Sequence, residues 1–257
     1  LKLKIRIAAV DGDNLMDRLD ELLHKGISLT NLDTREDFSQ IRDRVQSANA
    51  YLGSHSIARA LEEGAEVVVA GRVIDAGMAV APPLFEFGWE SGDWNRLASA
   101  LVAGHILECG AQASGGNLTD WDEVPSFLEM GYPIVEMCSD GSFHVTKPEG
   151  SGGLVNRKTV TEQLVYEIGN PRAYYTPDAI VDFTSVNLSD GKDNRLGVSG
   201  IRGHPPTGQL KVSISYQDGF MAHGTLIVSG PQALTKCRWI ADCFWNRLGI
   251  DFQEFST

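Results

Sequence analysis

Basic residues are scarce in this chain. It has 22 lysine and arginine residues against 34 aspartate and glutamate residues, which gives a formal net charge of -12 and a pI near 4.9. Nucleic acids and anionic membrane surfaces are bound by proteins with a basic footprint. The composition therefore excludes both as expected partners, although one local pocket could still hold a phosphorylated small molecule.

Long apolar runs and cysteine motifs are also missing. No run approaches the roughly 20 residues that span a bilayer. The four cysteines, Cys109, Cys138, Cys237 and Cys243, show no CxxC spacing, and no His/Cys cluster suggests zinc. We expect free thiols in a reducing compartment, which means the cytoplasm or a reducing organelle lumen. No pattern in the sequence requires a cofactor or a metal.

The first half of the chain alternates strand and helix signals. A β-rich run at 5–10 precedes an amphipathic helix that stops at Gly26, and residues 39–63 are typical of further helix. The apolar run 66–70 is typical of a strand buried on both faces. This alternation predicts a partial parallel α/β (Rossmann-like) domain over residues 1–130. A doubly wound sheet has about five strands, so we expect this domain to be incomplete at its N-terminus.

The second half, residues 131–257, predicts an α+β domain with antiparallel hairpins, and the boundary falls near 125–135. Asp140-Gly141 is a strong hairpin signal. Residues 81–93, rich in proline and glycine, predict a loop. Helices are expected over 94–109, 159–168 and 231–248, and strands over 133–138, 143–147, 179–188, 195–200, 209–216 and 221–228.

The expected helix at 94–109 carries a cluster of reactive side chains. His105 and Cys109 are four residues apart and would stack on one face, with Glu108 three residues from His105. Such a face could hold a metal or an imidazole-activated thiolate, but H-x-x-E-C is not a known ligand spacing, and packing explains any single residue better. The loop that follows adds the polar and small residues Gln112, Gly115, Gly116 and Asn117.

Arg72 and Asp75 directly follow the strand at 66–70. Open α/β sheets bind ligands beyond the carboxyl ends of their strands, which is where these two side chains would lie. Arg72 could grip a carboxylate or a phosphate, and Asp75 could act as a base or orient the arginine. An Arg–Asp pair that ties a loop to a helix is an equally good interpretation.

Two further stretches supply candidate binding residues. The run KPEGSGG lies between a strand and a helix, and its Lys147, Gly150 and Gly152 could cradle an anion or form a hinge. It matches neither a Walker A sequence nor a dinucleotide-binding fingerprint. Asn49, in SANAYLG, could orient a substrate, although capping or packing is the commoner role for such a residue.

Several stretches together resemble one family. Eight blocks from residue 47 to residue 186 are similar, in order, to the acyclic terpene utilisation protein AtuA family: SANAYLG, VVVAGRVIDA, FGW, LVAGHILECGAQASGGN, GYPIVEM, DGSFHVTKPEGSGGLV, TVTEQLVYEIG and DFTSV. The resemblance implies a protein from the breakdown of branched, unsaturated acids, in pathways that use CoA thioesters and a biotin-dependent carboxylase. It also implies that a further segment normally precedes the strand at 5–10.

The resemblance leads to two hypotheses. In the first, the chain is an enzyme that hydrates or otherwise moves a proton on a branched acid or its CoA thioester. Arg72 would grip the substrate, Asp75, His105 and Glu108 would act as acid and base, and the loop ending at Asn117 would stabilise an oxyanion. In the second, the chain is a non-catalytic accessory subunit of a carboxylase pathway. In both, we expect a homo-oligomer without nucleic-acid or membrane partners.

Overall fold

The computed structural model describes residues 4–221 and 223–249. The chain divides into two compact units, residues 1–217 and residues 218–257. Among the described residues, no helix is both long enough and apolar enough to cross a membrane. The six α-helices of the described ranges are α1 (Leu19–His24), α2 (His55–Glu62), α3 (Ala81–Phe87), α4 (Trp94–Glu108), α5 (Arg157–Val165) and, in the second unit, α6 (Ala233–Leu248).

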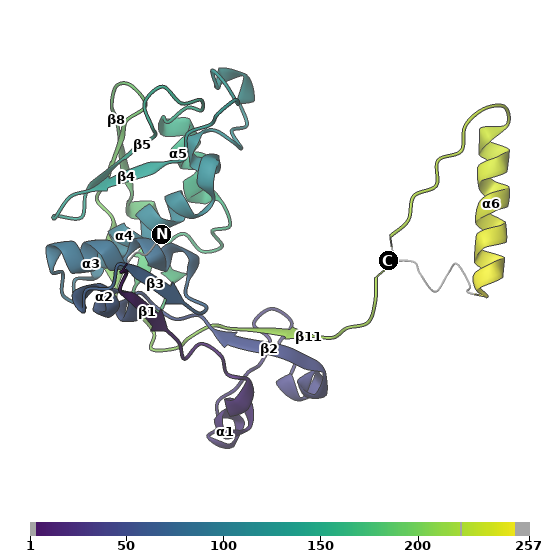
Figure 1. Cartoon of the computed structure of the whole chain (residues 1–257), viewed down its shortest axis with the longest axis horizontal. Helices are drawn as coiled ribbons and strands as arrows, with labels where there is room; N and C mark the ends of the chain where they lie inside the picture. The colour runs from purple at the N-terminus through teal and green to yellow at the C-terminus, as the bar shows by residue number, and fades with distance from the viewer. Residues whose placement is uncertain (1–3, 222, 250–257) are drawn as a thin grey trace. The chain divides into compact units, whose positions relative to one another are not determined.

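The strands form four small sheets in the first unit (Figure 1). The four-stranded antiparallel sheet has the order β4 (Ile134–Met137), β5 (Phe143–Thr146), β9 (Leu196–Ser199), β8 (Asn187–Asp190). The three-stranded sheet has the order β10 (Arg202–His204), β7 (Ile180–Asp182), β6 (Tyr174–Tyr175). Two ribbons complete the set: β1 (Ile7–Val10) with β3 (Val67–Ala70), which is parallel, and β2 (Val45–Ala50) with β11 (Val212–Tyr216), which is antiparallel. This confirms a mixed α/β fold with one small parallel sheet and antiparallel hairpins.

Helix α4, which was expected over 94–109, spans Trp94–Glu108 and contributes many residues to the main core. Every residue from Leu97 to Ile106 is buried, because the helix is rich in small and apolar side chains and has neighbours on all sides. Gly104 lets the helix approach the 3-10 helix η4 (Asp75–Ala79) closely, since a Cβ atom at this position would collide with the backbone of Ala76. The core cluster takes residues from both sides of 125–135, and that domain boundary stays a prediction.

The hairpin predicted at Asp140-Gly141 is confirmed. Strands β4 and β5 pair from Ile134 opposite Thr146 to Met137 opposite Phe143. Gly141 has a φ of 91° and occupies the left-handed position that a tight turn needs.

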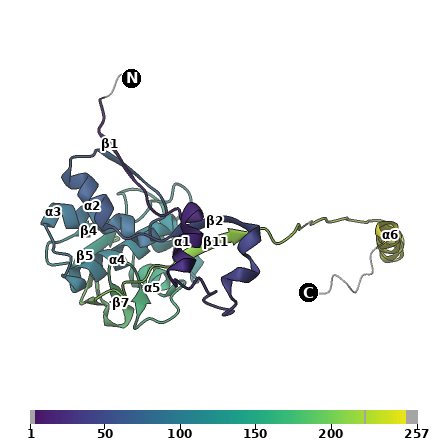
Figure 2. The ribbon, with the colours of Figure 1, turned by 90° about the horizontal axis from the view of Figure 1, so that it is seen from below.

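The helix expected over 39–63 is wrong in its first part. Residues 45–50 form strand β2, and the helix begins only at His55. Pairing with β11 buries Ala48 and Ala50, which are 0% and 4% exposed, and this tertiary contact overrides the local helical preference. The two strands lie side by side in both views (Figures 1 and 2).

Residues 81–93 contain helix α3 where a loop was expected. Two prolines occupy its first turn, where a missing amide hydrogen does no harm, and Gly88 ends it in the left-handed conformation with a φ of 61°. The strand expected over 179–188 is interrupted by the 3-10 helix η7 (Phe183–Ser185). The strand expected over 221–228 does not form at residue 221 or at 223–228, the described part of that range.

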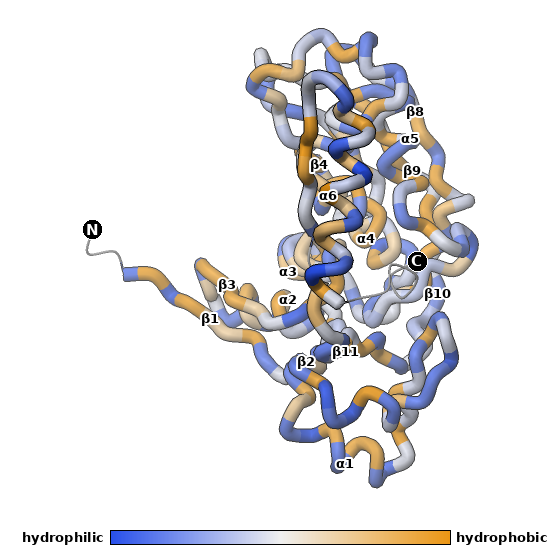
Figure 3. Tube along the Cα trace, turned by 90° about the vertical axis from the view of Figure 1, so that its right-hand side faces the viewer, coloured by the Kyte–Doolittle hydropathy of each residue, from blue (hydrophilic) through white to orange (hydrophobic). Residues whose placement is uncertain are grey.

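Strand β3 is not buried on both faces, as the run at 66–70 had suggested. Val67 and Val69 are 42% and 60% exposed, and Ile7 on the paired strand is 66% exposed. The alternate residues Val68 and Ala70 pack on the core. Figure 3 shows the apolar residues along β1 and β3. Within the described part of the first unit, no third strand joins this ribbon and these side chains of its outer face stay exposed.

Candidate functional site

A pocket of about 360 Å³ lies at the C-terminal end of α4 in the first unit. Its wall comes from α4, η4, β6, the turn after α5 and the segments that flank the β2–β11 ribbon. We call it the acid–base pocket because its ionisable lining residues include Asp75, His105, Glu108, Glu167, Tyr174 and Lys211.

His105 and Glu108 form a fixed pair on the last turn of α4. His105 is 2% exposed, and its Nε2 lies 2.9 Å from the carbonyl oxygen of Gln163 on α5. Because a carbonyl oxygen only accepts, Nε2 carries a hydrogen. The other ring nitrogen, Nδ1, lies 2.9 Å from Oε1 of Glu108, so one proton is held between imidazole and carboxyl. In return, Gln163 Nε2 donates to the His105 carbonyl oxygen at 2.7 Å.

Two cations lie against the ring of Tyr51, a lining residue of the pocket. Arg72 donates to Asp75 Oδ1 at 3.1 Å, and its guanidinium lies 4.8 Å from the centre of the Tyr51 ring. Lys211 Nζ lies 5.4 Å from the same ring, and the Tyr51 amide donates to the Lys211 carbonyl oxygen at 2.9 Å. The ribbon therefore brings Lys211 to the pocket, while Arg72 stands behind Tyr51, tied to Asp75.

Tyr174 is half-buried and stays protonated at neutral pH. Burial raises the pKa of its phenol, and the Glu108, Asp75 and Glu167 carboxylates raise it further. Its ring packs edge-on against Phe183 with centroids 5.5 Å apart, and Phe183 packs edge-on against His105 at 5.4 Å. This aromatic layer packs against the imidazole and supplies a neutral hydroxyl at the pocket wall.

The structure brings together part of the predicted site. Asp75, His105 and Glu108 line one pocket, and Arg72 contacts Asp75 beside it. Cys109 was expected to share a helix face with His105, but it does not line the acid–base pocket. Helix α4 ends at Glu108 and the chain turns there. The thiol lies instead in a second pocket of about 530 Å³, which also contains Gln112, Gly116 and Asn117. Gly115, with a φ of 96°, forms the turn between them.

The other predicted binding residues make contacts within the fold, outside the lining of the acid–base pocket. Lys147 Nζ donates to the Ser151 carbonyl oxygen at 2.7 Å and closes its own loop. At position 152 a Cβ atom would collide with the backbone of Leu128, so the close approach requires glycine. Gly150 has a φ of 73°, and nothing lies within 4 Å of a Cβ built there. Asn49 Nδ2 donates to Asp13 at 2.8 Å.

Several lining residues were missed in the sequence, among them the three ionisable residues Tyr174, Lys211 and Glu167. Tyr174 belongs to the pair Tyr174-Tyr175, an aromatic signal that could have been noticed. Lys211 comes from a distant part of the chain and reaches the pocket only through strand pairing. Glu167 has a φ of 55°, a left-handed conformation that no local sequence signal predicts for glutamate.

The described residues hold no group of three or more His, Cys, Asp or Glu side chains arranged to bind a metal ion. All four cysteines are free thiols. The fold and the pocket therefore define a mixed α/β protein in which a buried histidine, His105, pairs with Glu108 at the wall of a small cavity.

The chain belongs to the family described as acyclic terpene utilisation family protein AtuA, whose model matches residues 1–257. Membership implies a role in acyclic terpene utilisation. Comparison with curated proteins and with solved structures gave no significant match.

Proposed function

We propose that the acid–base pocket catalyses a proton-transfer reaction, such as hydration or its lyase reverse, on a branched, unsaturated acyl-CoA thioester. The observation that carries this proposal is the His105–Glu108 pair. The Gln163 carbonyl holds the imidazole in one orientation, and the carboxyl on its other side shares a single proton with it. Glu108 lines the pocket and is the group that contacts substrate, whereas the buried His105 is a positioning residue that supplies or takes back the proton.

The charge of the pocket favours the thioester over the free acid. The His105–Glu108 pair with its shared proton is neutral, and Asp75 and Glu167 face one lysine, Lys211, among the lining residues, so a substrate carboxylate would meet net negative charge. A thioester carbonyl is uncharged, and the protonated Tyr174 hydroxyl and the Lys211 ammonium can both donate to its oxygen. Such donors stabilise the enolate that forms when a proton leaves the α-carbon or when water adds to the β-carbon.

In the hydration direction the atoms balance as follows. The Glu108 carboxylate takes a proton from water as the water oxygen bonds to the β-carbon. The enolate then takes a proton at its α-carbon from the same acid–base pair, so one water is added and nothing is oxidised or reduced. Asp75 is the alternative base, and Arg72 orients it through their contact. No cofactor is needed. The free thiols fit a cytoplasmic protein.

Deuterium exchange tests the proposal without knowledge of the net reaction. The purified protein is incubated in D₂O with a branched α,β-unsaturated acyl-CoA, and mass spectrometry follows the added mass. We expect exchange or hydration with the wild-type protein, and a rate lower by about 10²–10⁴-fold in Glu108→Gln, because a positioned acid–base group contributes about that factor. The matched control is Glu90→Gln, at an exposed glutamate outside the pocket lining, which should react like the wild type. Equal rates in both variants would contradict the role of Glu108.

The second candidate function is the accessory subunit. It is favoured by the uncovered β1–β3 ribbon, since parallel strands are normally covered on both faces. Helix α6, considered by itself, also buries none of its residues, and Trp239 and Phe244 are 67% and 55% exposed. Apolar faces of this kind are typical of protein interfaces.

Purification distinguishes the two functions. A stable homo-oligomer that binds the thioester supports the enzyme, whereas co-elution with a biotin-dependent carboxylase, without exchange activity, supports the accessory subunit. Size-exclusion chromatography with light scattering gives the oligomeric state in either case.

A further inference from the structure

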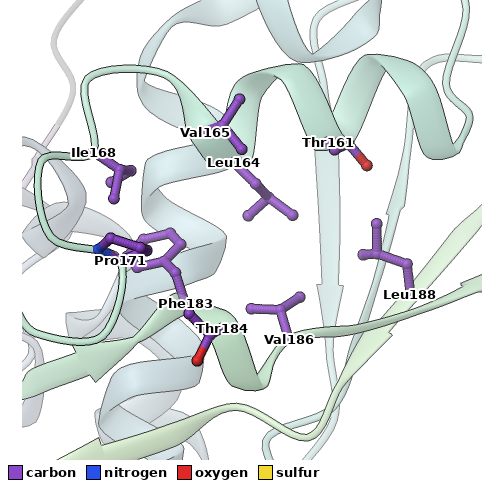
Figure 4. Close-up of a pocket in the computed structure, with 9 residues that line it drawn as sticks. All are labelled: Thr161, Leu164, Val165, Ile168, Pro171, Phe183, Thr184, Val186 and Leu188. Carbon is purple, nitrogen blue, oxygen red and sulfur yellow. The ribbon is translucent and has the colours of Figure 1, made fainter.

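A third pocket, which we call the apolar pocket, has a wall made mostly of hydrocarbon side chains. It has a volume of about 360 Å³, within the range of small-molecule sites. Figure 4 shows Leu164 and Val165 of α5 across from Val186 and Leu188, with the Phe183 ring at one end of the space. Val165 is 66% exposed here, so apolar surface is left in contact with water. No charged side chain lines this pocket.

The apolar pocket and the acid–base pocket share a partition. Phe183 lines the apolar pocket, and its ring packs against His105 at 5.4 Å and Tyr174 at 5.5 Å, two residues that line the acid–base pocket. The turn after α5 also separates them: Val165 lines one pocket and Glu167 the other. One aromatic side chain and one turn of backbone therefore stand between the proton-transfer groups and the hydrocarbon wall.

We propose that the apolar pocket is the subsite for the branched hydrocarbon chain of the acyl substrate. The inference rests on the proposed function, which places the thioester in the acid–base pocket. An acyclic terpenoid acyl group is a polar head joined to a long apolar chain, and the two pockets present the matching surfaces in adjoining positions. The half-buried Phe183 lies at the junction, and its ring turns aside so that the chain passes from the reacting carbons into the apolar pocket.

Binding of uncharged thioesters tests this assignment. Acetyl, hexanoyl and citronelloyl N-acetylcysteamine thioesters are titrated into the protein by isothermal calorimetry. We expect the wild-type affinity to rise with chain length, by on the order of tenfold or more from acetyl to citronelloyl, because each added carbon buries apolar area. Thr161→Trp fills the pocket from an exposed position on α5, and it should remove most of that gain while leaving acetyl binding unchanged.

The matched control places the same bulky residue elsewhere. Ser56→Trp, at an exposed position on α2 outside the lining, should bind all three thioesters like the wild type. Thr184→Trp blocks the pocket from the opposite wall and repeats the test if Thr161→Trp folds poorly, which circular dichroism shows. Undiminished citronelloyl binding in the folded blocking variants would overturn the subsite.

Failure of the proposed function looks different. Glu108→Gln should keep the chain-length dependence of binding while losing exchange. Chain-length-dependent binding without exchange by the wild-type protein would support the subsite and contradict the reaction. Exchange by the wild type together with undiminished citronelloyl binding in the blocking variants would support the reaction and contradict the subsite.

Discussion

Gly104 gives the sharpest test of how the acid–base pocket is assembled. A Cβ atom at this position would lie 2.8 Å from both the Cα and the carbonyl carbon of Ala76, and closer still to its carbonyl oxygen. Real Cβ contacts essentially never fall below 3.0 Å. The obstacle is backbone at a residue only 3% exposed, so no side chain can rotate away. In Gly104→Ala, α4 and η4 must move apart.

Two opposing effects set the size of the loss. Overpacking a tight core costs about 1–3 kcal/mol, while alanine in place of glycine inside a helix stabilises by about 1 kcal/mol. We expect the free energy of unfolding to fall by about 1–2 kcal/mol, since the clash involves backbone on both sides. Asp75 begins η4 and lines the pocket, so its separation from Glu108 should also change, and proton exchange should fall by up to about a hundredfold for a displacement near 1 Å.

Urea unfolding followed by circular dichroism measures the fall in the free energy of unfolding. The midpoint should fall with an unchanged slope, as for a mutation that alters stability alone. Gly92→Ala is the control, because nothing lies within 4 Å of a Cβ built there, and it should be neutral or slightly stabilising. If Gly104→Ala is as stable as the wild type and exchanges protons at the same rate, the close approach of α4 to η4 does not hold the pocket together.

Two further predictions concern a buried carboxyl and a strained residue. Burial raises the pKa of Asp178, against the opposing hydrogen bonds from the Ser54 amide, so the charged form is disfavoured in the folded state. The wild type should therefore lose stability relative to Asp178→Asn as the pH rises from about 3.8 through the raised folded pKa, in urea unfolding at several pH values, and a constant difference would contradict this. Glu167→Gly should raise the free energy of unfolding by about 1 kcal/mol or more, because glycine adopts the φ of 55° freely, and should slow exchange. Asp193→Gly, at a φ of 56° in an exposed loop, should stabilise without slowing exchange, and equal exchange in both glycine variants would show that the Glu167 side chain is not used.

The elements that could be predicted from the sequence carry their signals locally. Helix α4 is rich in leucine and alanine, which favour a helix, and the hairpin at Asp140-Gly141 has the turn residues that its geometry needs. Strand β2 lacks such a signal, because VQSANA has few large apolar residues and becomes a strand only by pairing with β11 far along the chain. The prolines that begin α3 suggested a loop, since proline breaks a helix interior but is favoured in a first turn.

The candidate site likewise contains residues that have a local sequence signal and residues that only tertiary contacts bring together. His105 and Glu108 could be found because they share one helix, and Asp75 because it follows a recognisable strand. Asn117 was grouped with them by proximity in sequence. It lies in another pocket because α4 ends at Glu108 and the 3-10 helix η5 (Gly110–Ser114) turns the chain away. Lys211 could not be predicted without the pairing of β2 and β11.

The turn at 165–168 connects these observations. Val165 and Ile168 line the apolar pocket, Glu167 lines the acid–base pocket, and Tyr166 lines the pocket that contains Asn117. Four consecutive residues can face three cavities only because the backbone reverses at Glu167, in a conformation that costs a non-glycine residue about 1–3 kcal/mol. Glycine would remove that cost together with the carboxylate, which raises the pKa of both Tyr166 and Tyr174. The strained backbone therefore places the Glu167 carboxylate in the lining of the acid–base pocket, where we propose that the thioester binds.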